Sequence, residues 1–135
     1  MTPFGEKLRA IRAARGLALK DMAAGLQVSP AYLSAMEHGR RGKPSRRFVH
    51  RVCQFLGIIW DEAEELQRLA DLSHPRVVVD TAGLSVKATL FANLLASRIG
   101  DLEEDKLDSL LREIDSVAGA PAGRTAGTEA DGDTP

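Results

Sequence analysis

The sequence of 135 residues predicts an all-α protein. Apolar side chains recur three and four positions apart along most of the chain, as in Leu107, Leu110, Leu111 and Ile114, and this spacing places them on one face of a helix. Residues that cap helices, serine before such a segment and glycine after it, punctuate the pattern. Aromatic residues make up only 4% of the chain, so the core must consist mainly of aliphatic side chains.

One segment departs from the helical pattern. Residues 76–80 read Arg-Val-Val-Val-Asp, and β-branched residues favour extended backbone. The segment is predicted to be an extended connector or one short strand. An isolated strand would need a partner, which another copy of the chain could supply.

The first helix is expected to begin at Pro3. Thr2 can cap it, and proline suits the first helical position because its missing N–H would have no partner there. Phe4, Leu8 and Ile11 form its apolar stripe, and Gly16 ends it.

Residues 17–45 predict two short helices joined by a tight turn and followed by a basic loop. Leu19, Met22, Ala23 and Leu26 share one face of the first helix. Ser29 can cap the second helix, which carries Leu33, Met36 and Glu37 before Gly39 ends it. The loop that follows contains Arg40, Arg41 and Lys43. This order of elements is that of a helix-turn-helix that reads DNA.

The same stretch resembles the lambda-repressor and Cro class of regulators, often called XRE-type. The matching positions are Ala23, Val28, Ser29, Leu33, Ser34, Glu37 and Gly39, with flanking likeness from Phe4 to Leu17 and from Pro44 to Gly57. The resemblance implies a five-helix DNA-binding domain over residues 1–73. It also implies a transcriptional regulator, most simply a repressor, that binds a pseudo-palindromic operator as a homodimer and is not an enzyme.

The resemblance has two further consequences. It implies a buried ion pair between Arg12 and Glu37. It also puts Gln27 where the family usually has glycine with positive φ, a conformation that costs a non-glycine residue about 1–2 kcal/mol.

Four more helices are expected to follow. Ser45 can cap a helix ending at Leu56, and Asp61 with Glu64 has the spacing of a capping box for the next, with Trp60 packed at its start. Ser85 can cap a helix that Gly100 breaks, and Asp101 with Glu104 repeats the capping-box spacing. The last two helices predict a C-terminal hairpin within residues 74–118. Residues 119–135 lack bulky apolar side chains and are expected to be disordered.

Candidate DNA-binding residues come from the helix-turn-helix and its flanks. Pro30, Ala31, Ser34 and Ala35 match base-contacting positions of the family, but none of them can form a paired hydrogen bond to a base. Tyr32 is expected to point aside and reach a phosphate, and basic side chains suit the backbone. The full set is Lys20, Gln27, Ser29, Pro30, Ala31, Tyr32, Ser34, Ala35, His38, Arg40, Arg41, Lys43, Arg46 and Arg47.

Charge is distributed unevenly along the chain. Residues 1–51 contain eleven lysines and arginines against three acidic residues, a net charge of +8, whereas residues 52–135 contain seven against sixteen, a net charge of −9. The basic half coincides with the helix-turn-helix, which favours double-stranded DNA as the partner.

The C-terminal hairpin is predicted to join two copies of the chain. Its two apolar stripes can pack on each other but leave apolar surface uncovered, which is typical of an interface. The dimerisation residues are Phe91, Leu94, Leu95, Ile99, Leu107, Leu110, Leu111 and Ile114. The alternative is an antitoxin-like protein that regulates its own operon and binds a partner protein through the acidic half.

No cofactor or metal is expected. His38, His50, His74 and Cys53 have no ligand spacing, and one cysteine is consistent with a reducing, cytoplasmic compartment. No apolar run reaches the roughly 18 residues that a membrane span needs, and residues 1–3 do not resemble a signal peptide.

Overall fold

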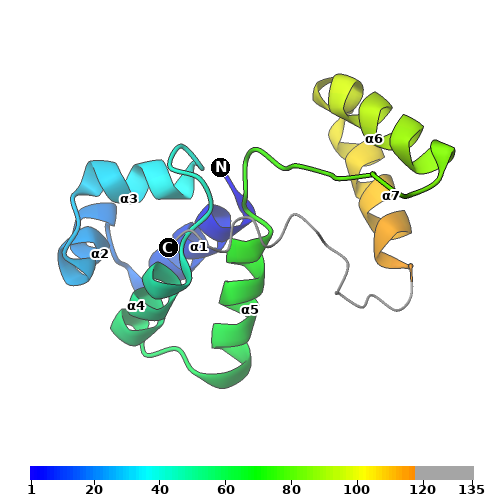
Figure 1. Cartoon of the computed structure of the whole chain (residues 1–135). Coiled ribbons are helices and arrows are strands. Elements are labelled where there is room, and N and C mark those ends of the chain that lie inside the picture. The colour runs from blue at the N-terminus through cyan, green and yellow to red at the C-terminus, as the bar shows by residue number, and fades with distance from the viewer. Residues whose placement is uncertain (118–135) are drawn as a thin grey trace. The chain divides into compact units, whose positions relative to one another are not determined.

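The computed structural model describes residues 1–117 of the chain, and within them every regular element is helical (Figure 1). The elements are α1 (Pro3–Arg15), α2 (Leu19–Leu26), α3 (Pro30–Glu37), α4 (Arg46–Leu56), α5 (Trp60–Asp71), α6 (Val86–Arg98), the 3-10 helix η1 (Ile99–Asp101) and α7 (Glu104–Asp115). The all-α prediction is confirmed. The short strand at 77–79 is not formed: these valines lie in an extended connector with no strand beside it.

The chain divides into two compact units. The first comprises Met1–Val77 and contains α1 to α5, and the second begins at Val78 and contains α6, η1 and α7. Residues 119–135, for which the sequence predicts disorder, lie outside the described part of the chain, as does residue 118.

The first unit has one continuous core. Helix α1 contacts α3 and α5, α2 contacts α3 and α4, and α4 contacts α5. The core is mainly aliphatic, as the composition requires, with Phe4 and Phe48 meeting edge to face at its centre. Its buried apolar residues are Phe4, Leu8, Met22, Ala23, Leu26, Leu33, Met36, Phe48, Val49, Val52, Cys53, Leu56, Ile58, Leu66 and Ala70.

Most helix ends of this unit follow from local sequence. The hydroxyls of Thr2, Ser29 and Ser45 accept hydrogen bonds from the backbone N–H three residues later, at 3.0, 3.0 and 3.1 Å. Gln27 has φ +60°, so it adopts the left-handed conformation that glycine normally supplies. Its N–H donates to the Ala24 carbonyl and that of Val28 to the Ala23 carbonyl, which satisfies two acceptors at the end of α2.

Two predicted helix starts are wrong. Helix α5 begins at Trp60 with Ile59 as its cap, and α7 begins at Glu104 with Glu103 as its cap, so neither Asp61 nor Asp101 caps a helix. Trp60 does not pack at the start of α5. It has φ +54°, and 78% of it is exposed. In neither case does the side chain of the cap residue make a capping hydrogen bond, and the acidic side chains in both first turns favour the helix start through the helix dipole.

The second unit has no buried residue in its described part. Helices α6 and α7 have none, and among their predicted stripe residues only Leu95 and Leu107 are half-buried. The two stripes therefore leave most of their apolar side chains exposed within one chain, as the sequence predicts. Helices α6 and α7 are joined by the short η1, and their pairing as a hairpin stays a prediction.

Helix α3 is joined to α1 through Glu37. The Arg12 Nη1 donates to Glu37 Oε2 at 2.7 Å, and both side chains are almost fully buried. The Glu37 carbonyl accepts from the Thr2 N–H at 3.1 Å. A Cβ on Gly5 would lie 2.0 Å from that carbonyl oxygen, so only glycine allows α1 to approach α3 this closely.

Burial raises the pKa of Glu37 above its ordinary value, while the neighbouring Arg12, Arg9 and His38 act to lower it. We therefore expect Arg12→Met to leave a buried carboxylate without its partner and to lower the free energy of unfolding at neutral pH by about 3–5 kcal/mol. The loss should shrink as pH falls, because protonation of Glu37 removes the buried charge and the folded state then binds more protons than the unfolded state. Chemical denaturation between pH 4 and 8, as a rough range for carboxyl titration in proteins, measures both effects.

Arg47→Met, in the same unit but exposed, is the matched control and should change stability little at any pH. The double variant Arg12→Met/Glu37→Met should recover part of the loss, since an apolar pair buries no charge. A loss for Arg12→Met no larger than that of the control would mean that the pair is solvated in solution.

Candidate nucleic-acid interface

The first turn of α3 presents a small, nearly uncharged surface. Pro30 and Ala31 are exposed, and Ser34 and Ala35 one turn later are half-exposed. The opposite face of the helix is buried through Leu33, Met36 and Glu37. The predicted base-contacting residues therefore share the outer face of α3, where a hydroxyl and a few methyl and methylene groups are the available chemistry.

The turn before α3 fixes the start of the helix. Ser29 caps the helix through its hydroxyl. Two residues earlier, the left-handed conformation of Gln27 makes the turn between α2 and α3. Both side chains are exposed. The first N–H groups of a helix point outward along its axis and attract anions, so the start of α3 offers donors as well as methyl groups.

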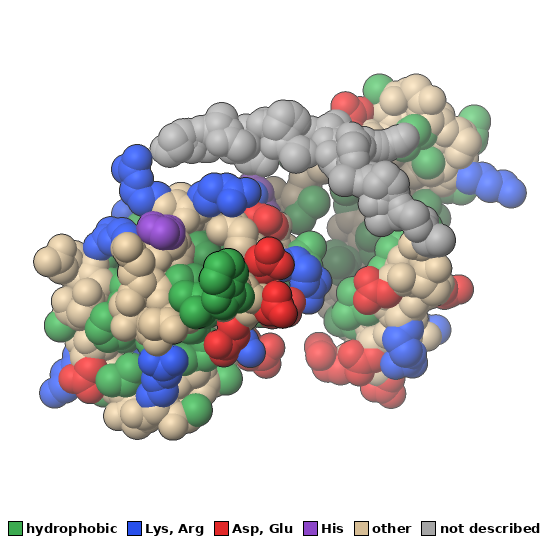
Figure 2. Space-filling model, turned by 90° about the horizontal axis from the view of Figure 1, so that it is seen from below, with side chains coloured by type: hydrophobic (Ala, Val, Ile, Leu, Met, Phe, Trp, Pro, Cys, Tyr) green, Lys and Arg blue, Asp and Glu red, His purple; other side chains and the backbone are tan. Residues whose placement is uncertain are grey.

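Basic side chains lie around this helix on three neighbouring segments. Lys20 is exposed in α2, Arg40 and Arg41 in the loop after α3, and Arg46 and Arg47 in the first turn of α4. Figure 2 shows lysine and arginine side chains distributed over the visible face of the first unit, at the left. Each of these three segments thus carries at least one exposed basic group.

Besides Ser29, which caps α3, four predicted site residues have partners inside the protein: Lys43, His38, Tyr32 and Arg41. Lys43 Nζ lies 3.6 Å from Asp71 Oδ1 at the end of α5. His38 Nδ1 lies 2.9 Å from the Ser34 carbonyl oxygen and so can donate to it. Tyr32 is half-buried and packs against the core rather than pointing aside into solvent.

Tyr32 belongs to an aromatic row that crosses the domain. Its ring centroid lies 6.2 Å from that of Phe48, which in turn lies 6.3 Å from Phe4. On its outer side the Arg41 guanidinium lies 4.8 Å from the Tyr32 centroid, the geometry of a cation–π contact. Nothing in the sequence indicates this contact, because it joins residues nine positions apart across an irregular loop.

Two arginines that could be mistaken for DNA ligands have structural roles. Arg15 Nη1 donates to the Leu56 carbonyl at 2.7 Å, at the end of α4. Arg51 Nη2 donates to the Leu26 carbonyl at the end of α2. Each satisfies a carbonyl that the helix itself leaves without a partner, so neither is counted with the exposed basic groups.

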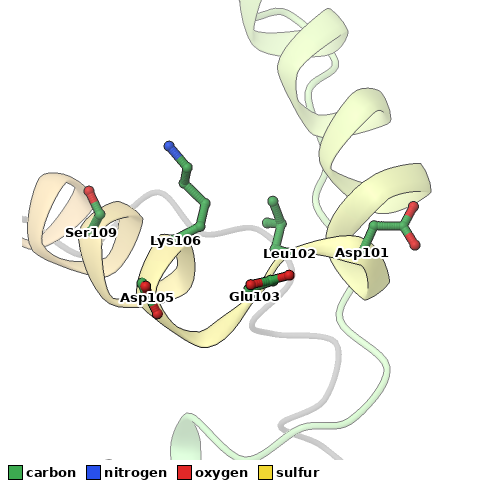
Figure 3. Close-up of a pocket in the computed structure, with 6 residues that line it drawn as sticks. All are labelled: Asp101, Leu102, Glu103, Asp105, Lys106 and Ser109. Atoms are coloured by element: carbon green, nitrogen blue, oxygen red, sulfur yellow. The ribbon is translucent and has the colours of Figure 1, made fainter.

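Other kinds of site find little support in residues 1–117. No group of three or more metal-ligating side chains occurs there, and no helix in that range could cross a membrane. A depression at the start of α7, lined by Asp101, Leu102, Glu103, Asp105, Lys106 and Ser109, is open to solvent. Figure 3 shows its charged side chains pointing in different directions, so they do not converge on one ligand.

Comparison with known proteins agrees with this geometry. The model of the helix-turn-helix domain family matches residues 3–69, which span α1 to nearly the end of α5. The N-terminal unit is a helix-turn-helix domain of this family.

Two proteins of Bacillus subtilis (strain 168) are similar to the same part of the chain. The HTH-type transcriptional repressor RghR is 36% identical over 61 residues, which are 45% of this chain and 45% of RghR. The uncharacterized HTH-type transcriptional regulator RghRB is 33% identical over 61 residues, 45% of this chain and 44% of RghRB. The chain thus matches less than half the length of these relatives. No solved structure gives a significant match.

Cys53 provides a test of the core assignment. It is buried in α4, and burial raises the pKa of its thiol above the ordinary value. Because the thiolate is the reactive form, we expect slow modification of Cys53 by a thiol reagent in the native protein. Modification should become fast in denaturant. Absorbance of the reagent measures the rate. A fast reaction without denaturant would mean that α4 opens or that Cys53 is a reactive thiol.

Proposed function

We propose that the protein is a sequence-specific DNA-binding transcriptional regulator, acting as a repressor on a pseudo-palindromic operator. The observation that carries this proposal is the exposed outer face of α3 with basic side chains on all the flanking segments, within a helix-turn-helix domain. The relative RghR is described as a transcriptional repressor, which favours repression over activation.

The first turns of α3 would enter the major groove, as the second helix of such a motif does. Ser34 can exchange one hydrogen bond with a base edge, and Pro30 and Ala31 can contact thymine methyl groups. Direct readout by α3 is therefore limited, and sequence-dependent DNA shape must supply part of the specificity. Lys20, Arg40, Arg46 and Arg47 are free to meet phosphates.

The proposal includes a homodimer formed through the second unit. A folded segment normally buries apolar side chains to offset the entropy of ordering its backbone, yet α6 and α7 bury none. Figure 2 shows hydrophobic side chains on the surface of this unit, at the right, among charged ones. Phe91 is 59% exposed, Leu111 58% and Ile114 59%. A second copy would cover these side chains and provide the second α3 that a pseudo-palindromic site requires.

A selection from random double-stranded DNA tests the function. We expect enrichment of a site with two related halves whose centres are about 34–36 Å apart, one turn of the duplex. An enriched site without repeated halves would agree with sequence-specific binding but would contradict the symmetric dimer. Failure to retain any duplex at low salt would contradict DNA binding itself.

Replacing Arg40 by alanine tests the phosphate contacts. Each contact contributes about −0.9 to the slope of log affinity against log salt. We therefore expect Arg40→Ala to flatten the slope by roughly that amount and to weaken all sequences alike. Fluorescence anisotropy with labelled duplex measures the slope, and Arg112→Ala in α7 is the control. A loss confined to one base pair would instead identify Arg40 as a base reader.

Replacing Leu111 by glutamate tests the dimer interface. A charge placed in a buried apolar interface is strongly unfavourable, so Leu111→Glu should convert a dimer into a monomer at micromolar concentration. Light scattering or sedimentation of the full chain measures this. Ser109→Glu, on the same helix but outside the apolar stripe, should remain dimeric.

If the wild-type chain is already monomeric, the apolar stripe does not join two copies in free solution. In that case a partner protein, as in the antitoxin-like alternative, becomes the better occupant of this surface.

A further inference from the structure

The loop between α3 and α4 folds back so that the Arg41 side chain lies beside the first turn of α3. Arg41 follows Tyr32 by nine positions, yet its guanidinium lies over the Tyr32 ring, and Tyr32 belongs to the first turn of the helix. The loop makes this return possible through left-handed glycines on both sides of Arg41, at Gly39 with φ +78° and Gly42 with φ +83°. Arg40, by contrast, shows no contact with an aromatic ring.

We propose that Tyr32 acts as a positioning residue that holds the Arg41 guanidinium ready to bind a DNA phosphate beside the first turn of α3. This inference rests on the proposed function and names the ligand of one basic group within it. It also assigns Tyr32 a role different from the one that the sequence predicts, since its ring acts on Arg41 and its hydroxyl need not touch DNA.

The chemistry of the contact supports a phosphate as the ligand. A guanidinium that lies over an aromatic face still has N–H groups that do not face the ring, and these can form hydrogen bonds to phosphate oxygens. Tyr32 leans on Phe48 of α4, so Arg41 lies on the side of α3 nearest α4, where Arg46 and Arg47 follow the Ser45 cap. That side flanks the groove-facing residues and suits the DNA backbone.

Holding the side chain in place beforehand has an energetic consequence. A free arginine loses rotamer freedom when it binds a phosphate, and prior contact with the Tyr32 ring reduces this loss. The row from Phe4 through Phe48 to Tyr32 ties the stack to the core. The structure therefore links one DNA contact to the packing of the domain.

A double-mutant cycle on the full chain tests the inference, with anisotropy of a labelled mixed-sequence duplex at several salt concentrations as the readout. Arg41→Ala should flatten the slope of log affinity against log salt by about 0.9. Tyr32→Leu should weaken binding roughly two- to tenfold, the range expected from the ordering of one long side chain. Tyr32→Phe keeps the ring and should bind like the wild type.

The cycle distinguishes positioning from a general loss of structure. Arg41→Ala should cost less affinity in the Tyr32→Leu background than in the wild type, whereas Arg40→Ala should cost the same in both. Equal losses of affinity for Arg41→Ala in the two backgrounds would overturn the inference. A loss of affinity for Tyr32→Phe as large as that for Tyr32→Leu would also overturn it, because it would assign the contact with DNA to the hydroxyl. If the wild-type protein binds no duplex at all, the proposed DNA-binding function itself is wrong, and this result is distinct from either outcome of the cycle.

Discussion

The position of α3, the helix proposed to read DNA, depends on one residue, Glu37. Its side chain binds Arg12, its carbonyl accepts from the Thr2 N–H, and the same carbonyl packs against Gly5. All three partners belong to α1 or its cap, so the end of α3 is fixed to the start of α1. The start of α1 is in turn held by Ser73, whose hydroxyl accepts from the Phe4 N–H at 2.9 Å and donates to the Leu69 carbonyl at 2.6 Å.

This arrangement makes specific geometry more important than net stability. Burial raises the pKa of Glu37 even though Arg12 is beside it, so the attraction does not fully offset the removal of the carboxylate from water. An apolar pair could fill the same volume without that cost, but it would not require one angle between α1 and α3. A buried ion pair satisfies its hydrogen bonds in few orientations, and such a restriction on α3 suits the groove-binding role proposed for it.

Local interactions explain which parts of the structure the sequence predicts. The caps at Thr2, Ser29, Ser45 and Ser85 each join residues three positions apart, so their chemistry is visible in the sequence. The helical stripes that form the core of the first unit are equally local in origin. The starts of α5 and α7 escaped prediction because an acidic residue followed by a glutamate three positions later fits a capping box but does not require one.

Contacts between distant residues could not be predicted in the same way. Lys43 meets Asp71 across 28 positions, and Arg41 meets Tyr32 only because two glycines turn the loop back on itself. These contacts divide the basic residues predicted to bind DNA into groups that the sequence does not distinguish: Lys43 is paired with a carboxylate, Arg41 lies over an aromatic ring, and the others are exposed. The arginines at 15 and 51, which bind helix ends, belong to a fourth group.

The weak base chemistry of α3 and the apolar surface of the second unit bear on the same requirement. One α3 offers Ser34 as its sole hydrogen-bonding side chain on the base-facing positions, so a single half-site can be distinguished from others by only a few contacts, each worth about 1–3 kcal/mol. Joining two domains makes the second half-site bind at a high effective concentration, which multiplies the discrimination without any new contact. Under the proposed dimer, the exposed apolar side chains of α6 and α7 and the few base-contacting groups of α3 serve the same end, because specificity would come from pairing two domains that each make few base contacts.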